Sequence, residues 1–467
     1  MPPDTGKPRS CAKRATPAPQ LRPKNRSRLD GLADWRIRPA VATPAARHAN
    51  PAAPQDKRSI VAKPHIQFSR VGRWALGLYL GTGMVGSGFG WALVVYKKVA
   101  GLADVPFPND LYLFETNTWW AVMAYPYVAL AQALLVWTFT GVVWFERGER
   151  TRGALIAVCA ALGVAAFHAY DLISVYAVLC TYGLVEIVRT RTLPWRLIGL
   201  TAAIGFLTAP IAIYYRLLTL NDPLWQSILA QYENAGVVTP AGLHLVVLVG
   251  LPLLLAPFGV RPLAGEPVPR LILVWAVVGG IIPFMPTVYQ VKLLTGWQFP
   301  VALLAARAWL RWTEAPAGRL ATFATPLTTA VLLALVVPTN LYMFAWRFVD
   351  LRRYERPFFL QRDELSALGW LAEHTSGADV VLAPLPVGQF APSYGRTRAY
   401  LAHWAMTNRF FERTASAERF FNPNEDAGVR RRVLDADKVT FVMATRTEAL
   451  GTGREAPPAW LQPVFSA

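Results

Sequence analysis

Ionisable and aromatic residues stand at the ends of long apolar stretches in this chain. His168 and Asp171 lie in a short junction between two such stretches, and Tyr289 and Lys292 follow the end of another. A cation beside a carboxylate at a membrane boundary could hold a phosphate group and orient a neighbouring hydroxyl group. These side chains therefore indicate a polar site where apolar helices end.

Most of these residues also have a purely structural interpretation. Asp171 could cap the helix that follows it, because Asp is a favoured N-cap residue. Lys292 could be an anchor whose charged end reaches the lipid headgroups, and Glu233 could be part of a solvated loop. The sequence predicts no catalytic residue, but it predicts the following substrate-binding set: His168, Asp171, Asp222, Glu233, Tyr289, Lys292 and His403.

Nine apolar stretches must position these residues. A helix needs about 20 apolar residues to cross about 30 Å of hydrocarbon. Four stretches reach that length, and the third and eighth are short enough to be half-helices or re-entrant segments. A composition with 54% hydrophobic and 16% charged residues agrees with a membrane protein. The stretches are residues 73–96, 119–145, 153–167, 171–188, 196–217, 242–259, 271–287, 298–312 and 320–344.

Basic residues alternate between the loops that join these stretches. The N-terminal segment and every second loop carry Arg. The intervening loops are poorer in basic residues and hold the acidic residues Asp104, Asp110, Glu115, Asp171, Asp222 and Glu233. The positive-inside rule therefore places the N-terminus in the cytoplasm and the loops of His168 and Lys292 on the other side. Lys97 and Lys98, after the first stretch, are the exception. The C-terminal region falls on the outer side as well.

Residues 1–70 differ in composition from the rest of the chain. They are rich in Pro, Ala and Arg and show no apolar period, so we expect a disordered basic cytoplasmic segment. Two interpretations remain open. The segment could be attracted to anionic lipid, at about 1 kcal/mol per basic residue, or it could be a tail without function or an artefact of a start codon assigned too early. It has almost no aromatic residues for base stacking, so no nucleic-acid partner is expected.

Several reaction classes find no support in the sequence. The three cysteines, Cys11, Cys159 and Cys180, are scattered and show neither a disulfide framework nor metal-ligand spacing. There is no glycine-rich phosphate loop and no catalytic triad pattern. The sequence thus predicts no metal site made of clustered ligands and no soluble reaction class.

Residues 346–467 show the patterns of a small α/β domain. Short apolar runs typical of buried strands alternate with segments of helical period, which suggests a small parallel sheet. The predicted strands are residues 379–383 and 438–443, and the predicted helices are residues 362–375, 407–421 and 425–434. The fold class is thus a polytopic α-helical membrane protein. About nine transmembrane helices lie in residues 71–345, and an extracytoplasmic α/β domain follows.

Seven short motifs occur along the chain in a recognisable order. They are Gly88-Phe-Gly-Trp91, Asn109-Asp-Leu-Tyr112, Phe114-Glu-Thr-Asn117, Ala124-Tyr-Pro-Tyr127, His168-Ala-Tyr-Asp171, Asn221-Asp-Pro-Leu-Trp225 and Ala402-His-Trp-Ala-Met-Thr407. Across residues 72–445 this order resembles the GT-C class of polytopic bacterial glycosyltransferases.

The resemblance implies transfer of a sugar from a polyprenyl-phosphate-linked donor to a lipid, glycan or protein acceptor. The reaction would take place at the outer face of the bacterial cytoplasmic membrane. An inverting transfer needs a base at the acceptor hydroxyl and cations, from side chains or a divalent metal ion, near the leaving phosphate. His168 and Lys292 fit the second role, and His403 would lie near the acceptor.

One departure from the GT-C pattern concerns the catalytic acidic residue. GT-C enzymes carry it in their first outer loop, whereas Asp110 and Glu115 match a later loop of the family, so neither receives that role here. We therefore expect either a chain that lacks the N-terminal half of the family bundle or a non-catalytic scaffold in envelope glycan assembly. A transporter is a weaker alternative, because no internal repeat is visible and the acidic residues gather at the outer edge.

Overall fold

The computed structural model describes residues 88–466 apart from 232–237, 261–266, 288, 315–318, 357 and 446–459. The predictions for residues 1–70, for most of the first apolar stretch and for Glu233 lie outside the described residues. The described chain is mostly helical, with one small parallel sheet near its C-terminal end.

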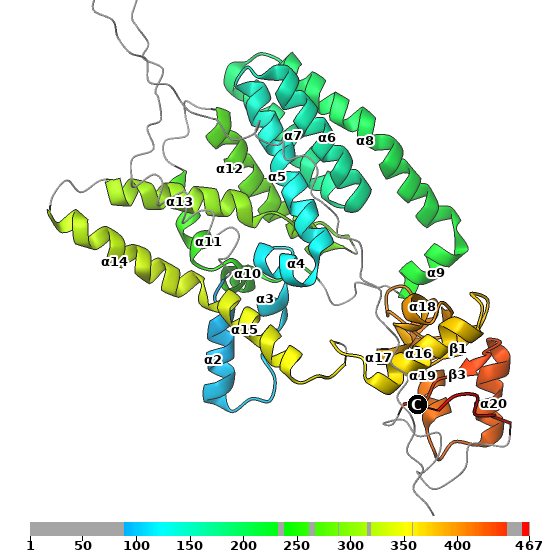
Figure 1. The fold of residues 1–467 in the computed structure, drawn as a ribbon. Helices are drawn as coiled ribbons and strands as arrows, with labels where there is room; N and C mark the ends of the chain where they lie inside the picture. Colours follow the sequence, from blue (N-terminus) through cyan, green and yellow to red (C-terminus); the bar gives the residue numbers. More distant parts are fainter. Residues whose placement is uncertain are drawn as a thin grey trace, which may run out of the picture. The chain divides into compact units, whose positions relative to one another are not determined.

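Four helices are long and apolar enough to cross a membrane: α5 (Pro126–Glu146), α6 (Arg150–Phe167), α7 (Asp171–Thr190) and α8 (Trp195–Asn221). Figure 1 shows them as neighbouring helices, coloured cyan to green. Within the described ranges, the number rises to six if two bent helix pairs each count as one span. The prediction of about nine transmembrane helices is therefore not confirmed, whereas the prediction of several membrane-spanning helices is supported.

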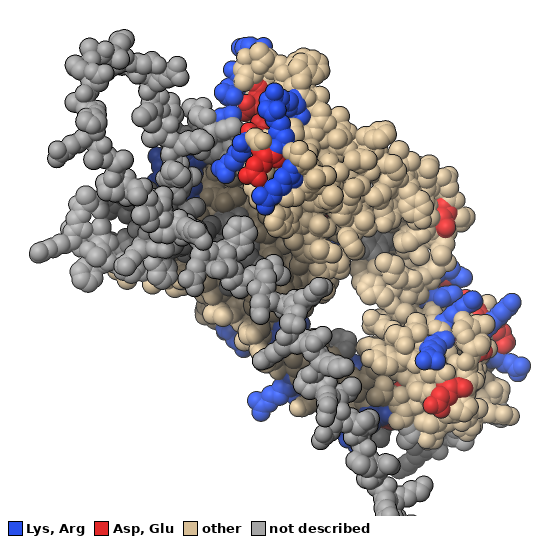
Figure 2. Space-filling model, turned by 45° about the horizontal axis from the view of Figure 1, so that its top comes forward, with Lys and Arg blue, Asp and Glu red and all other residues tan. Residues whose placement is uncertain are grey.

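Charged side chains are unevenly distributed over these helices. Figure 2 shows broad uncharged surfaces and a group of basic and acidic side chains at one end. The turns from α5 to α6 and from α7 to α8 lie at a common end and carry exposed arginines, among them Arg150, Arg152 and Arg191. An apolar outer surface with a charged end is the pattern expected of a bundle in lipid.

The helices α5 and α6 pack with their backbones in near contact. A Cβ atom on Gly141 would lie 2.5 Å from the backbone nitrogen of Ala157, and one on Gly153 would lie 2.4 Å from that of Phe145. Small residues allow this approach, which is a common way for membrane helices to associate without a hydrophobic driving force. These contacts lie at the end of the helix pair where α5 turns into α6.

The predicted stretch 242–259 forms two helices and not one. The helix α10 (Gly242–Val249) meets α11 (Leu251–Leu255) and its 3₁₀ continuation, η1 (Ala256–Gly259), at an angle of 108°. The bend occurs at Gly250, whose φ of +70° favours glycine. The bend leaves backbone carbonyl groups of α10 without a partner inside the helix. One of them, the carbonyl oxygen of Leu248, accepts a hydrogen bond from Gly88 N–H, before α2, at 2.9 Å.

The predicted stretch 320–344 is broken in the same way. It forms α14 (Arg319–Val336) and α15 (Pro338–Arg352), with a bend of 50° between residues 330–336 and α15. Pro338 lacks a backbone N–H and is tolerated at the first position of a helix, so it starts a new helix instead of extending α14.

The remaining elements of this region are short, and the connections between them carry most of the polar residues discussed below. They are α2 (Gly90–Ala100), α3 (Asn109–Tyr112), α4 (Thr118–Ala124), α9 (Pro223–Gln231), α12 (Pro267–Ile281), η2 (Ile282–Phe284), η3 (Gln290–Leu294) and α13 (Gln298–Glu314).

The C-terminal part contains the predicted small parallel sheet, which is confirmed. Its strand order is β2-β1-β3, with β1 (Val380–Leu382) between β2 (Arg398–Ala399) and β3 (Phe441–Val442). Val381 pairs with Ala399 on one side and with Phe441 on the other. The sequence did not predict β2, whose two residues are too few to show a strand pattern. The helices of this part are α16 (Arg362–His374), α17 (Leu385–Gly388), α18 (Ala391–Tyr394), α19 (Phe410–Phe421) and α20 (Ala427–Ala436).

Candidate functional site

An ion pair between a buried carboxylate and a half-buried lysine joins two distant parts of the membrane region. Glu115 lies between α3 and α4 with a 1% exposed side chain, and Lys292 belongs to η3, 177 residues later. Lys292 Nζ donates to Glu115 Oε1 at 2.8 Å and lies 4.6 Å from the centre of the Phe114 ring. The ring face stabilises the cation further. Glu115 is also held through its backbone, since its carbonyl oxygen accepts from Gln132 Nε2 at 3.1 Å.

A second pair of ionisable groups lies at the junction of α6 and α7. His168 follows the last residue of α6 and Asp171 is the first residue of α7, and His168 Nδ1 is 3.1 Å from Asp171 Oδ2. Both side chains are buried, at 7% and 0% exposure. Tyr170, and not Asp171, stands at the N-cap position of α7. The helix-cap interpretation of Asp171 is therefore wrong.

The two pairs form one cluster. Burial raises the pKa of Glu115, and the positive charges of Lys292 and His168 oppose this rise. Lys292 also interacts electrostatically with Asp171. Among the described residues, Glu115 Oε2 has no hydrogen-bond partner, so this buried carboxylate keeps capacity to accept a donor from a ligand. A lysine, a histidine and two carboxylates could together hold an anionic group and a hydroxyl group.

Aromatic rings form one side of this cluster. The Tyr170 and Tyr289 rings lie 4.8 Å apart between centroids, and the Tyr170 ring meets the His168 ring at 5.7 Å. Tyr127 approaches His168 from α5 at 6.3 Å. The predicted residues His168, Asp171, Tyr289 and Lys292 thus lie near one another at helix ends.

The other predicted site residues have different surroundings. Asp222 caps α9, because its Oδ1 accepts from the backbone N–H groups of Leu224 and Trp225 at 2.8 and 3.1 Å. His403 is exposed in the C-terminal part, where its Nδ1 accepts from Ala405 N–H at 3.2 Å. These contacts are local, and the binding roles of Asp222 and His403 remain predictions.

The sequence analysis left Glu115 out of the predicted set although the residue completes the cluster. The sequence analysis gave Glu115 no role, because its motif resembles a GT-C loop other than the one that carries the catalytic acidic residue. A usable signal was present nonetheless. An acidic residue between apolar stretches requires a countercharge, and Lys292 is a basic residue of a predicted outer loop.

No group of three or more His, Cys, Asp or Glu residues in the described ranges could hold a metal ion. The divalent cation that the resemblance allowed therefore stays a prediction, and the cationic side chains of this cluster are the positive groups that the structure supplies. The chain matches no protein-family model, and it matches no curated protein.

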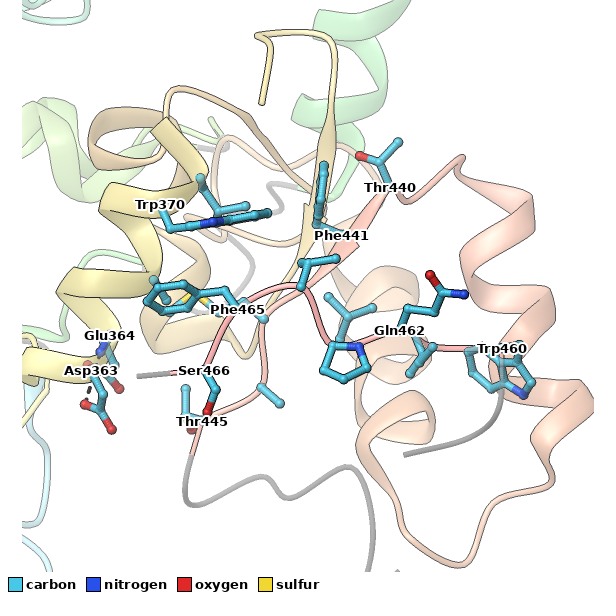
Figure 3. Close-up of a pocket in the computed structure, with 18 residues that line it drawn as sticks. Asp363, Glu364, Trp370, Thr440, Phe441, Thr445, Trp460, Gln462, Phe465 and Ser466 are labelled. Carbon is cyan, nitrogen blue, oxygen red and sulfur yellow. Dashed lines mark hydrogen bonds between the residues drawn. The ribbon is translucent and has the colours of Figure 1, made fainter. Parts of the chain in front are cut away.

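A separate concavity of about 670 Å³ lies beside β3 in the C-terminal part. Figure 3 shows Trp370 of α16, Phe441 of β3 and Phe465 of the C-terminal segment around it, with Asp363 and Glu364 at one end. The Trp370 ring lies 6.0 Å from that of Phe441 and 5.9 Å from that of Phe465. His403 is not among the lining residues, so its predicted role gains no support from this pocket.

Proposed function

We propose that this membrane protein takes part in the transfer of a sugar from a polyprenyl-phosphate-linked donor at the outer face of the bacterial cytoplasmic membrane, as in the GT-C class. The observation that carries the proposal is the cluster of Glu115, His168, Asp171 and Lys292. It combines a half-buried lysine, a buried histidine and two buried carboxylates from separate segments, next to the ends of membrane helices.

The chemistry of such a transfer matches the charges of the cluster. The phosphate of the donor leaves as an anion, which Lys292 and His168 would bind and stabilise. The carboxylates of Glu115 and Asp171 hold these two cations in place and could orient an acceptor hydroxyl. Positioning of this kind accounts for a large part of catalysis when two molecules must react.

The proposed orientation follows from the basic loops, with the N-terminus in the cytoplasm and the cluster on the outer side. A phosphatase reporter fused after Arg347, which should lie on the outer side, tests it. We expect activity from a reporter that requires an extracytoplasmic location. Activity of a cytoplasmic reporter at the same position would overturn the orientation and the outer-face assignment with it.

A transfer assay tests the function itself. The full chain in lipid vesicles is given a polyprenyl phosphate that carries a radiolabelled sugar, together with a mixture of envelope glycans and lipids as acceptors. We expect labelled product with the wild type and at least about tenfold less with Lys292→Ala, because a charged hydrogen bond to the leaving phosphate is lost. Lys98→Ala is the matched control, since Lys98 is an exposed lysine at the end of α2.

A non-catalytic scaffold in envelope assembly is the second candidate, and one observation favours it. Each cation of the cluster is already paired with a carboxylate, Lys292 with Glu115 and His168 with Asp171. Such pairs could serve only to fix the register of the helices. The scaffold predicts no labelled product from the wild type, whereas the enzyme predicts product that depends on Lys292.

A further inference from the structure

A second acid–base pair lies outside the cluster described above. Asp110 of α3 and His244 of α10 are 134 residues apart in sequence, and Asp110 Oδ2 lies 2.6 Å from His244 Nδ1. The Asp110 side chain is 3% exposed and that of His244 is 29% exposed. Burial raises the pKa of Asp110, and the hydrogen bond with His244 opposes the rise. The carboxylate is thus enclosed, while part of the imidazole reaches the surface.

The fold fixes the position of this imidazole. His244 is in the first turn of α10, the helix that is bent away from α11 at Gly250. The Phe107 ring packs edge-on against the imidazole at 4.7 Å between centroids. Phe107 has a φ of +52°, a conformation that costs a residue with a side chain about 1–2 kcal/mol. The surrounding structure therefore holds both neighbours of the imidazole, the carboxylate and the ring.

The pair is linked to the Glu115–Lys292 cluster through one buried apolar group. Leu113 belongs to the segment that carries both acidic residues. It packs in the same group as Leu245, which follows His244, and Leu294, which lies two residues after Lys292. The two polar groups are therefore arranged around shared packing, although they use different carboxylates.

The carboxylates of the first cluster already lie against Lys292 and His168. The imidazole of His244 differs. With Nδ1 directed to a carboxylate, its Nε2 is left as the proton acceptor, which is the arrangement by which a carboxylate orients a histidine base. In the part of the chain that the structure describes, His244 Nε2 has no hydrogen-bond partner.

We propose that His244, oriented by Asp110, is the general base of the sugar transfer, a role that rests on the function proposed above. In this step the proton of the acceptor hydroxyl moves to His244 Nε2. The hydroxyl oxygen forms a bond to the anomeric carbon, and the bond from that carbon to the phosphate oxygen breaks. The polyprenyl phosphate leaves with the electron pair, and Asp110 stabilises the imidazolium that results.

The test uses the full chain in lipid vesicles with the labelled polyprenyl phosphate sugar. General bases typically contribute 10²- to 10⁴-fold to rate, so we expect His244→Ala to reduce transfer by at least about 100-fold. Added imidazole should restore part of the loss by replacing the missing base. His244→Asn retains a donor for Asp110 without a base and should fold normally with the same loss. His374→Ala removes an exposed histidine of α16 and should transfer at the wild-type rate.

The outcomes separate the two proposals. A wild type that forms no labelled product refutes the proposed function, and with it the role of His244. A wild type that forms product while His244→Ala and His244→Asn retain more than half of the rate refutes the role of His244 alone. A loss in His244→Ala that imidazole does not restore, together with a matching loss of thermal stability in His244→Asn, shows that the pair is only structural.

Discussion

Removal of Lys292 should destabilise the membrane region because it leaves the carboxylate of Glu115 buried without a countercharge. Glu115 is 1% exposed and Lys292 is 20% exposed. Loss of one partner of a fully buried ion pair costs about 3–5 kcal/mol. Two features reduce this figure. Burial raises the pKa of Glu115, so the orphaned carboxyl group can take up a proton, and the partial exposure of Lys292 screens the pair. We therefore expect a cost of about 2–3 kcal/mol for Lys292→Met.

Heat denaturation of the protein in detergent measures this cost. For a region of about 250 residues, 2–3 kcal/mol corresponds to a decrease of about 4–6 °C in the apparent unfolding temperature. Glu115→Gln should cost less, because it leaves a partly exposed lysine that can reach water. The double variant should recover at least half of the loss of Lys292→Met, since no buried charge remains. An unfolding temperature of Lys292→Met within about 1 °C of the wild type would refute the reasoning.

Two further predictions concern packing and pH. Gly153→Ala should lower stability by about 1–3 kcal/mol, because its Cβ would lie 2.4 Å from Phe145 N, whereas Gly183→Ala meets no atom within 4 Å and should be neutral or stabilising in the same heat denaturation. In the C-terminal part, the N–H and hydroxyl groups of Ser376 hold the pKa of the half-buried Asp379 below its ordinary value. This contribution to stability is present above the ordinary pKa of about 3.9 and is lost as the pH falls through the lowered folded-state pKa. Acid unfolding of Asp379→Asn should therefore show a smaller dependence on pH than the wild type between about pH 2 and 4, and an equal dependence would contradict the assignment.

Residues close together in sequence were the easiest to place. The junction between α6 and α7 is so short that His168 and Asp171 must lie near each other whatever the rest of the fold does. The C-terminal strands were recognisable as well, because Val380–Leu382 and Phe441–Val442 stand in short apolar runs between segments of helical period. In these places the local pattern determines the local structure.

The contacts between distant segments could not be predicted in this way. Nothing in the spacing of Glu115 and Lys292, or of Asp110 and His244, indicates that they meet, because each contact depends on how several helices pack. The predicted single spans 242–259 and 320–344 differ from the structure for another reason. Hydropathy measures only apolar length, whereas Gly250 and Pro338 interrupt the backbone of stretches that are apolar throughout.

The central claim, that the cluster around Lys292 binds a lipid-linked phosphate, is tested most directly by binding. Native mass spectrometry of the full chain in nanodiscs can compare polyprenyl phosphate with the corresponding polyprenol. The proposal predicts that only the phosphate-bearing lipid binds to the wild type and that Lys292→Met weakens this binding at least about tenfold, with Lys98→Met unchanged. Equal binding of the two lipids, or unchanged binding to Lys292→Met, would contradict it.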